Sequence, residues 1–170
     1  MNHLATEDTS WGSHLVPLMA CITATRGAVL EVGVGYWSTP LLHAYCAAAG
    51  RTLVSIDEDK GWIERFKEYS IGRHVVEHCA YGPYLAKAAE QQFSVVFLDG
   101  SPGHARADQA MLFRDSANLI VIHDYSGAEV ADPFKAVIDN WKFRAVAQFS
   151  PSCLILGNIP IPDFEKRIEV

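Results

Sequence analysis

Short apolar runs that alternate with helical patterns constrain the fold of this chain more than any other feature. Most of these runs are apolar throughout instead of alternating between apolar and polar residues, which is typical of strands buried on both faces of a parallel sheet. We predict strands at residues 27–34, 52–57, 74–80, 93–99, 117–124, 143–150 and 153–158. Because helical segments separate the first five, right-handed crossovers should join these five strands in parallel.

The last two predicted strands follow a different rule. Only a Pro–Ser turn separates them, which is too short for a crossover helix, so they should form an antiparallel hairpin. The sequence therefore predicts an α/β fold, a Rossmann-like, doubly wound, seven-stranded sheet with five parallel strands and a C-terminal antiparallel β-hairpin.

Helical periodicity places the connecting helices between these strands. We expect helices at 39–50, 61–69, 81–91, 103–115 and 133–141. Gly50 should end the first of them, and Pro133 should lie near the first turn of the last. An extra N-terminal helix is expected within 11–25, where Pro17 would kink or restart it.

Composition and charge limit the kind of protein. The 170 residues predict a single domain over 1–170, with 1–25 as an N-terminal helical cap. A formal net charge of −6 disfavours a nucleic-acid partner. The four cysteines form no CxxC pair, so we expect free thiols instead of a zinc site or a disulfide framework. We find no signal peptide and no apolar run of membrane-spanning length, which predicts a cytoplasmic protein without a membrane contact.

The stretch VLEVGVGYWSTP (29–40) contains a glycine turn between the first strand and its helix. Gly33 and Gly35 would let a ligand approach the backbone closely. Dinucleotide sites have a third glycine where Ser38 stands, and they bind a pyrophosphate that Glu31 would oppose. An acid at this position instead suits a ligand with a cationic amino-acid end.

A second acid fits the same ligand. Asp57 ends the second predicted strand, 22 residues after Gly35, which is the spacing at which an acid accepts hydrogen bonds from ribose hydroxyls. Glu58, which follows it directly, is the alternative ribose ligand. A ligand with a ribose, a cationic tail and no phosphate is S-adenosylmethionine (SAM).

These motifs resemble the class I SAM-dependent methyltransferases, over nearly the whole chain. The resemblance implies that Gly33, Gly35 and Ser38 contact the cofactor, with Glu31 near its amino end, Asp57 on the ribose and the segment of Cys79, Ala80 and Tyr81 beside the adenine. Asp99, after the fourth strand, belongs to the same pattern. GYWSTPLL also resembles a subset of small bacterial members, of the O-methyltransferase type.

Candidate catalytic residues follow the fourth and fifth strands. His123 is the candidate general base, with Asp99 and Asp124 beside it. Alternatively, Asp99 and Asp124 could hold Mg²⁺ as a Lewis acid for substrate hydroxyls, because LDGS and IHDY resemble segments of sugar and catechol-type O-methyltransferases, some of which need Mg²⁺. Trp11 and His14 could line the acceptor pocket if the N-terminal helix covers the strand ends.

The sequence thus predicts a SAM-dependent methyltransferase that acts on a hydroxyl of a small molecule. The signature of amino-directed enzymes is absent after the fourth strand, where the chain reads DGSP. A non-catalytic SAM-binding or scaffold protein with the same fold is the first alternative, and an NAD-dependent oxidoreductase is the second. The chain carries little inserted sequence to enclose a substrate, so a homodimer that completes the site is a further expectation.

Overall fold

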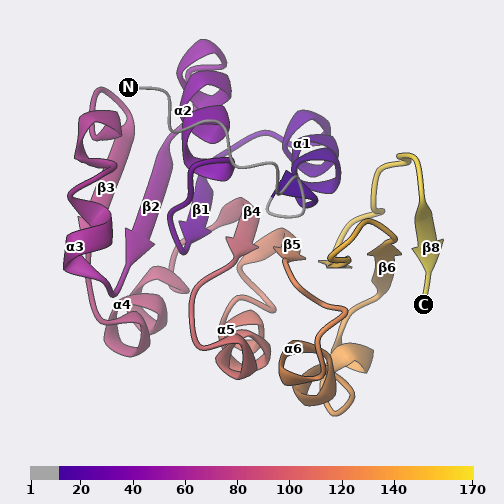
Figure 1. The fold of residues 1–170 in the computed structure, drawn as a ribbon. Helices are drawn as coiled ribbons and strands as arrows, with labels where there is room; N and C mark the ends of the chain where they lie inside the picture. Colours follow the sequence, from indigo (N-terminus) through magenta and orange to yellow (C-terminus); the bar gives the residue numbers. More distant parts are fainter. Residues whose placement is uncertain (1–11) are drawn as a thin grey trace.

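The computed structural model describes residues 12–170, and their strands form one eight-stranded sheet (Figure 1). The strands are β1 (Val29–Val32), β2 (Leu53–Asp57), β3 (His74–His78), β4 (Phe93–Leu98), β5 (Ala117–Ile122), β6 (Phe143–Ala147), β7 (Cys153–Gly157) and β8 (Arg167–Glu169). Their order across the sheet is β3-β2-β1-β4-β5-β7-β6-β8.

The pairing confirms the predicted fold class. β1 to β5 pair in parallel, whereas β7 pairs antiparallel with both β5 and β6. The seven-strand prediction missed β8, which adds an antiparallel edge next to β6. Its three residues are too few to show a hydrophobic pattern, and it forms because Ile168 pairs with Val146.

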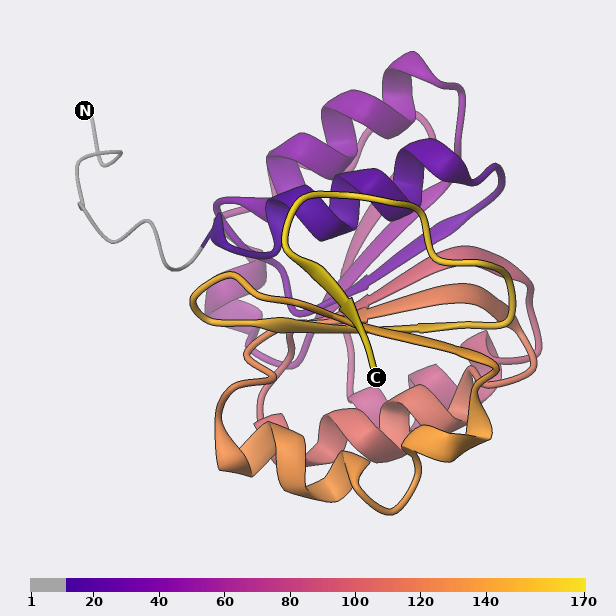
Figure 2. The same cartoon turned by 90° about the vertical axis from the view of Figure 1, so that its right-hand side faces the viewer.

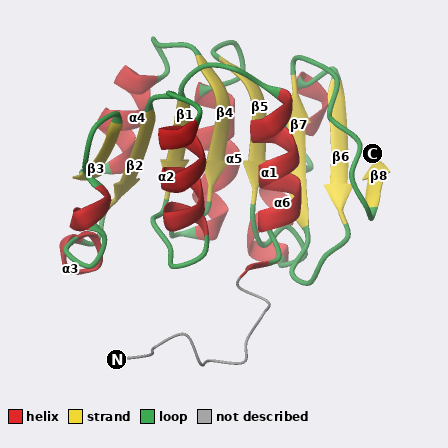
Figure 3. Ribbon diagram, turned by 90° about the horizontal axis from the view of Figure 1, so that it is seen from above, coloured by secondary structure: helices red, strands yellow, loops and turns green. Residues whose placement is uncertain are grey.

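Helices cover both faces of the sheet. α1 (Leu15–Ala24) and α2 (Ser38–Ala48) lie on one face, and α4 (Tyr81–Ala88), α5 (Arg106–Leu112) and α6 (Ala128–Phe134) lie on the other (Figures 2 and 3). The short α3 (Lys60–Ile63) and the 3-10 turns Lys67–Tyr69, Gly103–Ala105 and Ile138–Asn140 complete the helical elements. Each face has its own apolar core, so the central strands are buried on both sides.

The two proline predictions were wrong in detail. Pro17 does not kink a helix, because α1 begins at Leu15 and the N–H that proline lacks would have no partner in a first turn anyway. Pro133 lies near the end of α6 and not at its start. The N–H that proline lacks would have bonded the Glu129 carbonyl, and the helix ends at the next residue. The predicted stop at Gly50 is confirmed: α2 ends at Ala48, and Gly50 has φ +65°, a conformation that favours glycine.

Two other predicted helices are shorter than expected. The segment 61–69 contains only α3 and a 3-10 turn, and 103–115 opens with a 3-10 turn before α5. The described part of the predicted cap over 1–25 contains α1, and residues 1–11, with Trp11, lie outside the described part of the chain. Within residues 12–170, no helix has the length and apolar character needed to cross a membrane.

The register of the sheet brings the carboxyl ends of three strands to one edge. Val32 is aligned with Leu98, and Leu98 with Ile122. The ladder continues one residue further, because the Asp99 N–H donates to the Val32 carbonyl at 2.8 Å and the His123 N–H to the Leu98 carbonyl at 3.1 Å. Residues far apart in the sequence therefore meet where the strands end.

Candidate functional site

The glycine turn follows β1 at this edge, and its two glycines have different roles. Gly33 has φ +92°, and a Cβ there would stand 2.5 Å from the Gly100 nitrogen, so the crossing of two backbones requires glycine. At Gly35 the nearest atom to a Cβ would be the Ser38 Oγ, at 3.4 Å. Because the protein itself does not fill the space at Gly35, this position fits the close approach of a ligand to the backbone.

Glu31 and Ser38 lie beneath the turn instead of facing its open side. Side chains alternate along β1, so Glu31 points to the face that α2 covers, where it is fully buried. Its carboxylate accepts hydrogen bonds from the hydroxyls of Thr39 and Ser55, and the same Thr39 oxygen accepts from the Gly35 N–H at 2.9 Å. The predicted direct contact of the Glu31 and Ser38 side chains with a cofactor is not supported by this burial.

The environment of Glu31 also changes its titration. Burial raises the pKa of Glu31 to about 7, although hydroxyl groups nearby act in the opposite direction. The acid therefore holds the glycine turn from below through Thr39, and its charge depends on pH in the neutral range.

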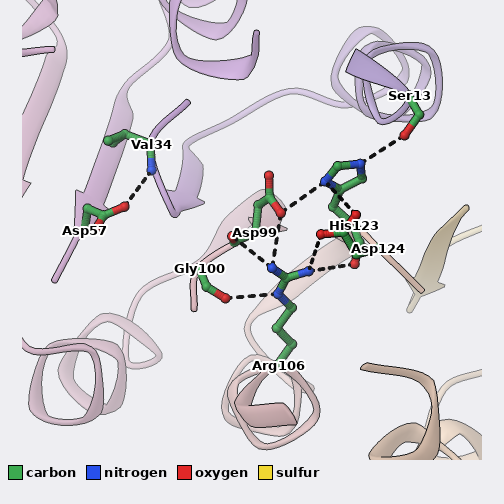
Figure 4. A network of polar contacts seen from close by, with 8 residues as sticks. All are labelled: Ser13, Val34, Asp57, Asp99, Gly100, Arg106, His123 and Asp124. Atoms are coloured by element: carbon green, nitrogen blue, oxygen red, sulfur yellow. Dashed lines mark hydrogen bonds and ion pairs between the residues drawn. The ribbon is translucent and has the colours of Figure 1, made fainter. Parts of the chain in front are cut away.

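Asp57, the predicted ribose ligand, lies beside the turn. Its carboxylate accepts from the Val34 N–H at 3.2 Å (Figure 4) and from the Asp59 N–H at 2.8 Å, and it remains partly exposed. Contact with a ribose stays a prediction. Burial raises the pKa of Asp57, and the two N–H donors oppose this. Glu58, the alternative, instead accepts the Tyr81 N–H at 2.7 Å at the start of α4.

The segment predicted to flank the adenine runs from β3 into α4. Ala80 is exposed, whereas Tyr81 is buried against Gly100, whose added Cβ would meet the Tyr81 ring at 2.8 Å. Tyr81 therefore packs against Gly100 near the strand ends, and Ala80 faces the solvent. Contact of either residue with an adenine stays a prediction.

Asp99 and His123 meet at the ends of β4 and β5 and form a polar chain with Ser13. The His123 Nδ1 lies 3.1 Å from the Asp99 Oδ1, and its Nε2 lies 2.9 Å from the Ser13 Oγ (Figure 4). A carboxylate can only accept hydrogen bonds, so the Nδ1–H donates to Asp99 and leaves the Nε2 to accept from the hydroxyl. This arrangement is that of a general base oriented by an acid.

Arg106 on α5 is a residue of the candidate site that the sequence did not indicate. Its guanidinium donates to the carbonyls of Gly100, His123 and Asp99 at 3.0, 2.8 and 3.0 Å (Figure 4). It also lies 3.2 Å from the Asp99 carboxylate and 3.6 Å from that of Asp124. A single buried arginine therefore fixes the ends of both strands. No motif points to it, because an arginine in a helix is ordinarily a surface residue.

The position of Arg106 does not fit the predicted Mg²⁺ site. A cation shared by Asp99 and Asp124 would stand where the guanidinium already lies between them. Asp124 is also the less buried of the two, and has a left-handed backbone with φ +56°. The position of the guanidinium therefore does not fit Mg²⁺ bound by Asp99 and Asp124, and Arg106 provides the positive charge beside them instead.

His14 reaches the same place from the N-terminal side. Its ring packs against His123 with the ring centres 4.6 Å apart, and against Phe97 at 4.8 Å. His14 is 2% exposed, and burial, with His123 as a smaller cause, lowers its pKa to about 4. Its place in an acceptor pocket stays a prediction. His104, in contrast, is an exposed side chain next to Glu129.

A cavity of about 560 Å³ lies away from this site, where α1 and α2 end, and is lined by residues that include Thr25, Tyr45 and Arg51. None of the predicted site residues lines it. The convergence of polar groups at the carboxyl ends of the strands is the stronger indication of a site, because ligands of doubly wound sheets bind at that edge.

Comparisons with solved structures define the class of fold. An S-adenosylhomocysteine-bound methyltransferase from Podospora anserina matches with a TM-score of 0.68 and 12% identity, over 83% of this chain and 75% of that chain. A TehB-like SAM-dependent methyltransferase from Corynebacterium glutamicum gives 0.56 and 12%, over 83% and 86%. A spermidine synthase in complex with the analogue AdoDATO gives 0.64 and 11%, over 89% and 60%. No protein-family model matches the sequence, and neither does any curated protein.

The chain therefore has the fold of the class I SAM-dependent methyltransferases, as the resemblance in its motifs predicted. At these identities the similarity extends to the fold alone. One of the matches is a spermidine synthase, so the reaction has to be argued from the site and not from the fold.

Proposed function

We propose that this protein is a SAM-dependent methyltransferase that methylates a hydroxyl group of a small molecule, with His123 as the general base. The main supporting observation is the series of hydrogen bonds from Asp99 through His123 to the Ser13 hydroxyl. It places a hydroxyl on the His123 nitrogen that is free to accept a proton, while a carboxylate holds the other nitrogen.

The residues of the glycine turn fit the cofactor. The open space at Gly35 allows an adenosine ligand to lie against the backbone, and the partly exposed Asp57 keeps acceptor capacity for ribose hydroxyls. Bound SAM would supply the electrophilic methyl group on its sulfonium.

The acceptor hydroxyl would replace the Ser13 Oγ at the His123 Nε2. As the new O–CH₃ bond forms and the S–CH₃ bond breaks, the hydroxyl proton passes to the Nε2, and S-adenosylhomocysteine leaves. Asp99 stabilises the imidazolium that forms and holds the ring in the right orientation. Arg106 holds the Asp99 and His123 backbones, so base and acid keep their relative position without a metal ion between Asp99 and Asp124.

The proposal for a small acceptor is supported by the negative charge of the chain. A net charge of −6 does not favour a nucleic-acid backbone. The hydroxyl class is supported by the histidine–acid pair, since an alcohol must lose its proton during transfer, whereas a neutral amine can attack while it still carries its proton.

Calorimetry of the purified protein with SAM and S-adenosylhomocysteine tests the cofactor, and release of S-adenosylhomocysteine with a panel of hydroxylated small molecules tests the reaction. We expect His123→Gln to keep SAM binding and to lose at least about a hundredfold in transfer rate. The matched control is His104→Gln, an exposed histidine. The absence of SAM binding to the wild type would overturn the assignment, and an unchanged rate in His123→Gln would overturn the base.

A further inference from the structure

Both ring nitrogens of His14 are buried and have no hydrogen-bond partner among residues 12–170. The side chain is 2% exposed, and a buried polar group without a partner destabilises the folded state. The proposed methyl transfer gives His14 no task that would justify this cost. A ligand that bonds to one of its nitrogens would remove part of the cost.

The neighbours of His14 indicate which ligand. His14, Asp99 and His123 each offer one ligand atom, and these atoms all lie within 4.8 Å of one another. They come from three separate places in the chain: the entry to α1 and the ends of β4 and β5. Two imidazoles and one carboxylate are the donor set of borderline divalent transition ions, whereas Mg²⁺ prefers oxygen ligands alone.

We propose that His14, Asp99 and His123 form a site for a divalent transition ion such as Zn²⁺, and that binding of this ion inhibits methyl transfer. The ion would bind the His123 Nδ1, which faces Asp99. The ring proton would then lie on the Nε2, so His123 could no longer take the acceptor proton. The inhibition rests on the proposed function, but the binding of the ion does not.

The geometry requires only a local adjustment. A tetrahedral Zn²⁺ site holds its ligand atoms about 3.3 Å apart, so atoms that lie up to 4.8 Å apart would approach one another by up to about 1.5 Å. The His123 Nδ1 lies 3.1 Å from the Asp99 Oδ1, and an ion bound by both residues would replace the proton of this hydrogen bond. The Nε2 would then carry the ring proton and donate to the Ser13 Oγ, 2.9 Å away, so it could not accept a proton from the acceptor hydroxyl.

The charges of the site are compatible with a cation. Asp99 and Asp124 carry two negative charges, and Arg106 carries one positive charge beside them. Arg106 lies between the two acids and contacts the Asp99 Oδ1, so the Oδ2 of the same carboxylate is the oxygen that would bind the ion.

A titration with Co²⁺, a coloured substitute for Zn²⁺, tests the site directly. The full chain is freed of metal with a chelator, and the visible absorption is followed for the wild type, His14→Phe and the control His104→Phe. We expect the wild type to bind one Co²⁺ with the strong visible bands of a four- or five-coordinate ion. His14→Phe should bind at least about tenfold more weakly, and His104→Phe should bind like the wild type.

Two results would overturn the proposal: a wild type without one-to-one Co²⁺ binding, or a His14→Phe variant that binds as tightly as the wild type. Circular dichroism confirms that each variant folds, and His14→Gln replaces His14→Phe if the latter does not. Inhibition is measured as the effect of Zn²⁺ on S-adenosylhomocysteine release. Unaltered release at a saturated metal site would refute the inhibition, whereas absence of SAM binding to metal-free wild type would refute the methyltransferase and leave the Co²⁺ result valid.

Discussion

Replacement of Glu31 by glutamine should remove a pH-dependent cost from the folded state. Burial raises the pKa of Glu31 from its usual 4.5 to about 7. The gap between these values, at 1.36 kcal/mol per pH unit, corresponds to about 3 kcal/mol. Because the folded state has the higher pKa, this contribution to stability is complete below pH 4.5 and is lost as the pH rises through 7.

Urea unfolding of the wild type and Glu31→Gln at pH 5 and pH 8 measures this effect. The free energy of unfolding of the wild type, relative to the variant, should fall by about 2–3 kcal/mol between the two pH values. The comparison with the variant is necessary because His14 and His74 have lowered pKa values, each about 4. Their contributions have the opposite sign: they are present above pH 6.5 and are lost as the pH falls towards 4.

The exposed glutamate Glu90 provides the matched control. Glu90→Gln makes the same chemical change on the surface, so its stability difference from the wild type should vary little with pH. If the Glu31→Gln difference were equally constant between pH 5 and pH 8, the carboxylate would be ionised at both pH values. The reasoning from burial would then be refuted.

Three further predictions concern the turn and the strand ends. Gly33→Ala should lower the melting temperature, because its Cβ would meet the Gly100 backbone. Gly35→Val should keep the melting temperature of the wild type and lose SAM binding in calorimetry. Equal behaviour of the two variants would contradict this division of roles. Arg106→Met should lower the free energy of unfolding by about 3–5 kcal/mol in urea, since it leaves buried acceptors unpaired. Arg106→Lys should restore only part of the lost free energy. A loss below about 1 kcal/mol in Arg106→Met would contradict the role of Arg106. Asp57→Asn should weaken SAM binding about tenfold with little change in stability, and undiminished affinity would exclude Asp57 as the ribose ligand.

The parallel part of the fold could be predicted because most of its strands are short, largely apolar runs. Apolar residues without alternation require burial on both faces, and helices between the runs provide the cover. The short elements could not be predicted in this way. β8 has three residues, and α3 has four, so their formation depends on the neighbours against which they pack.

The candidate site shows a similar division. Asp99, His123 and Asp57 could be found because strand ends of a parallel sheet meet at one edge. Arg106 could not, since its burial depends on how α5 lies against β4 and β5. The direction of the Glu31 side chain could not be predicted either. The pattern of glycines gives the position of Glu31 in the chain but not the face of β1 to which its side chain points.

The sequence by itself determined the α/β class, the parallel direction of the first five strands, the terminal hairpin and the edge of the sheet where the candidate site lies. These features follow from the patterns of apolar residues and glycines and from the lengths of the connecting segments. Such patterns involve residues of one element or of elements that are neighbours in the sequence. Only the tertiary structure decided that Arg106 takes the place between Asp99 and Asp124, that Glu31 supports the turn from below, and that His14 and Ser13 reach His123. Each of these contacts joins residues from different elements, and burial among distant neighbours sets their charges and hydrogen bonds.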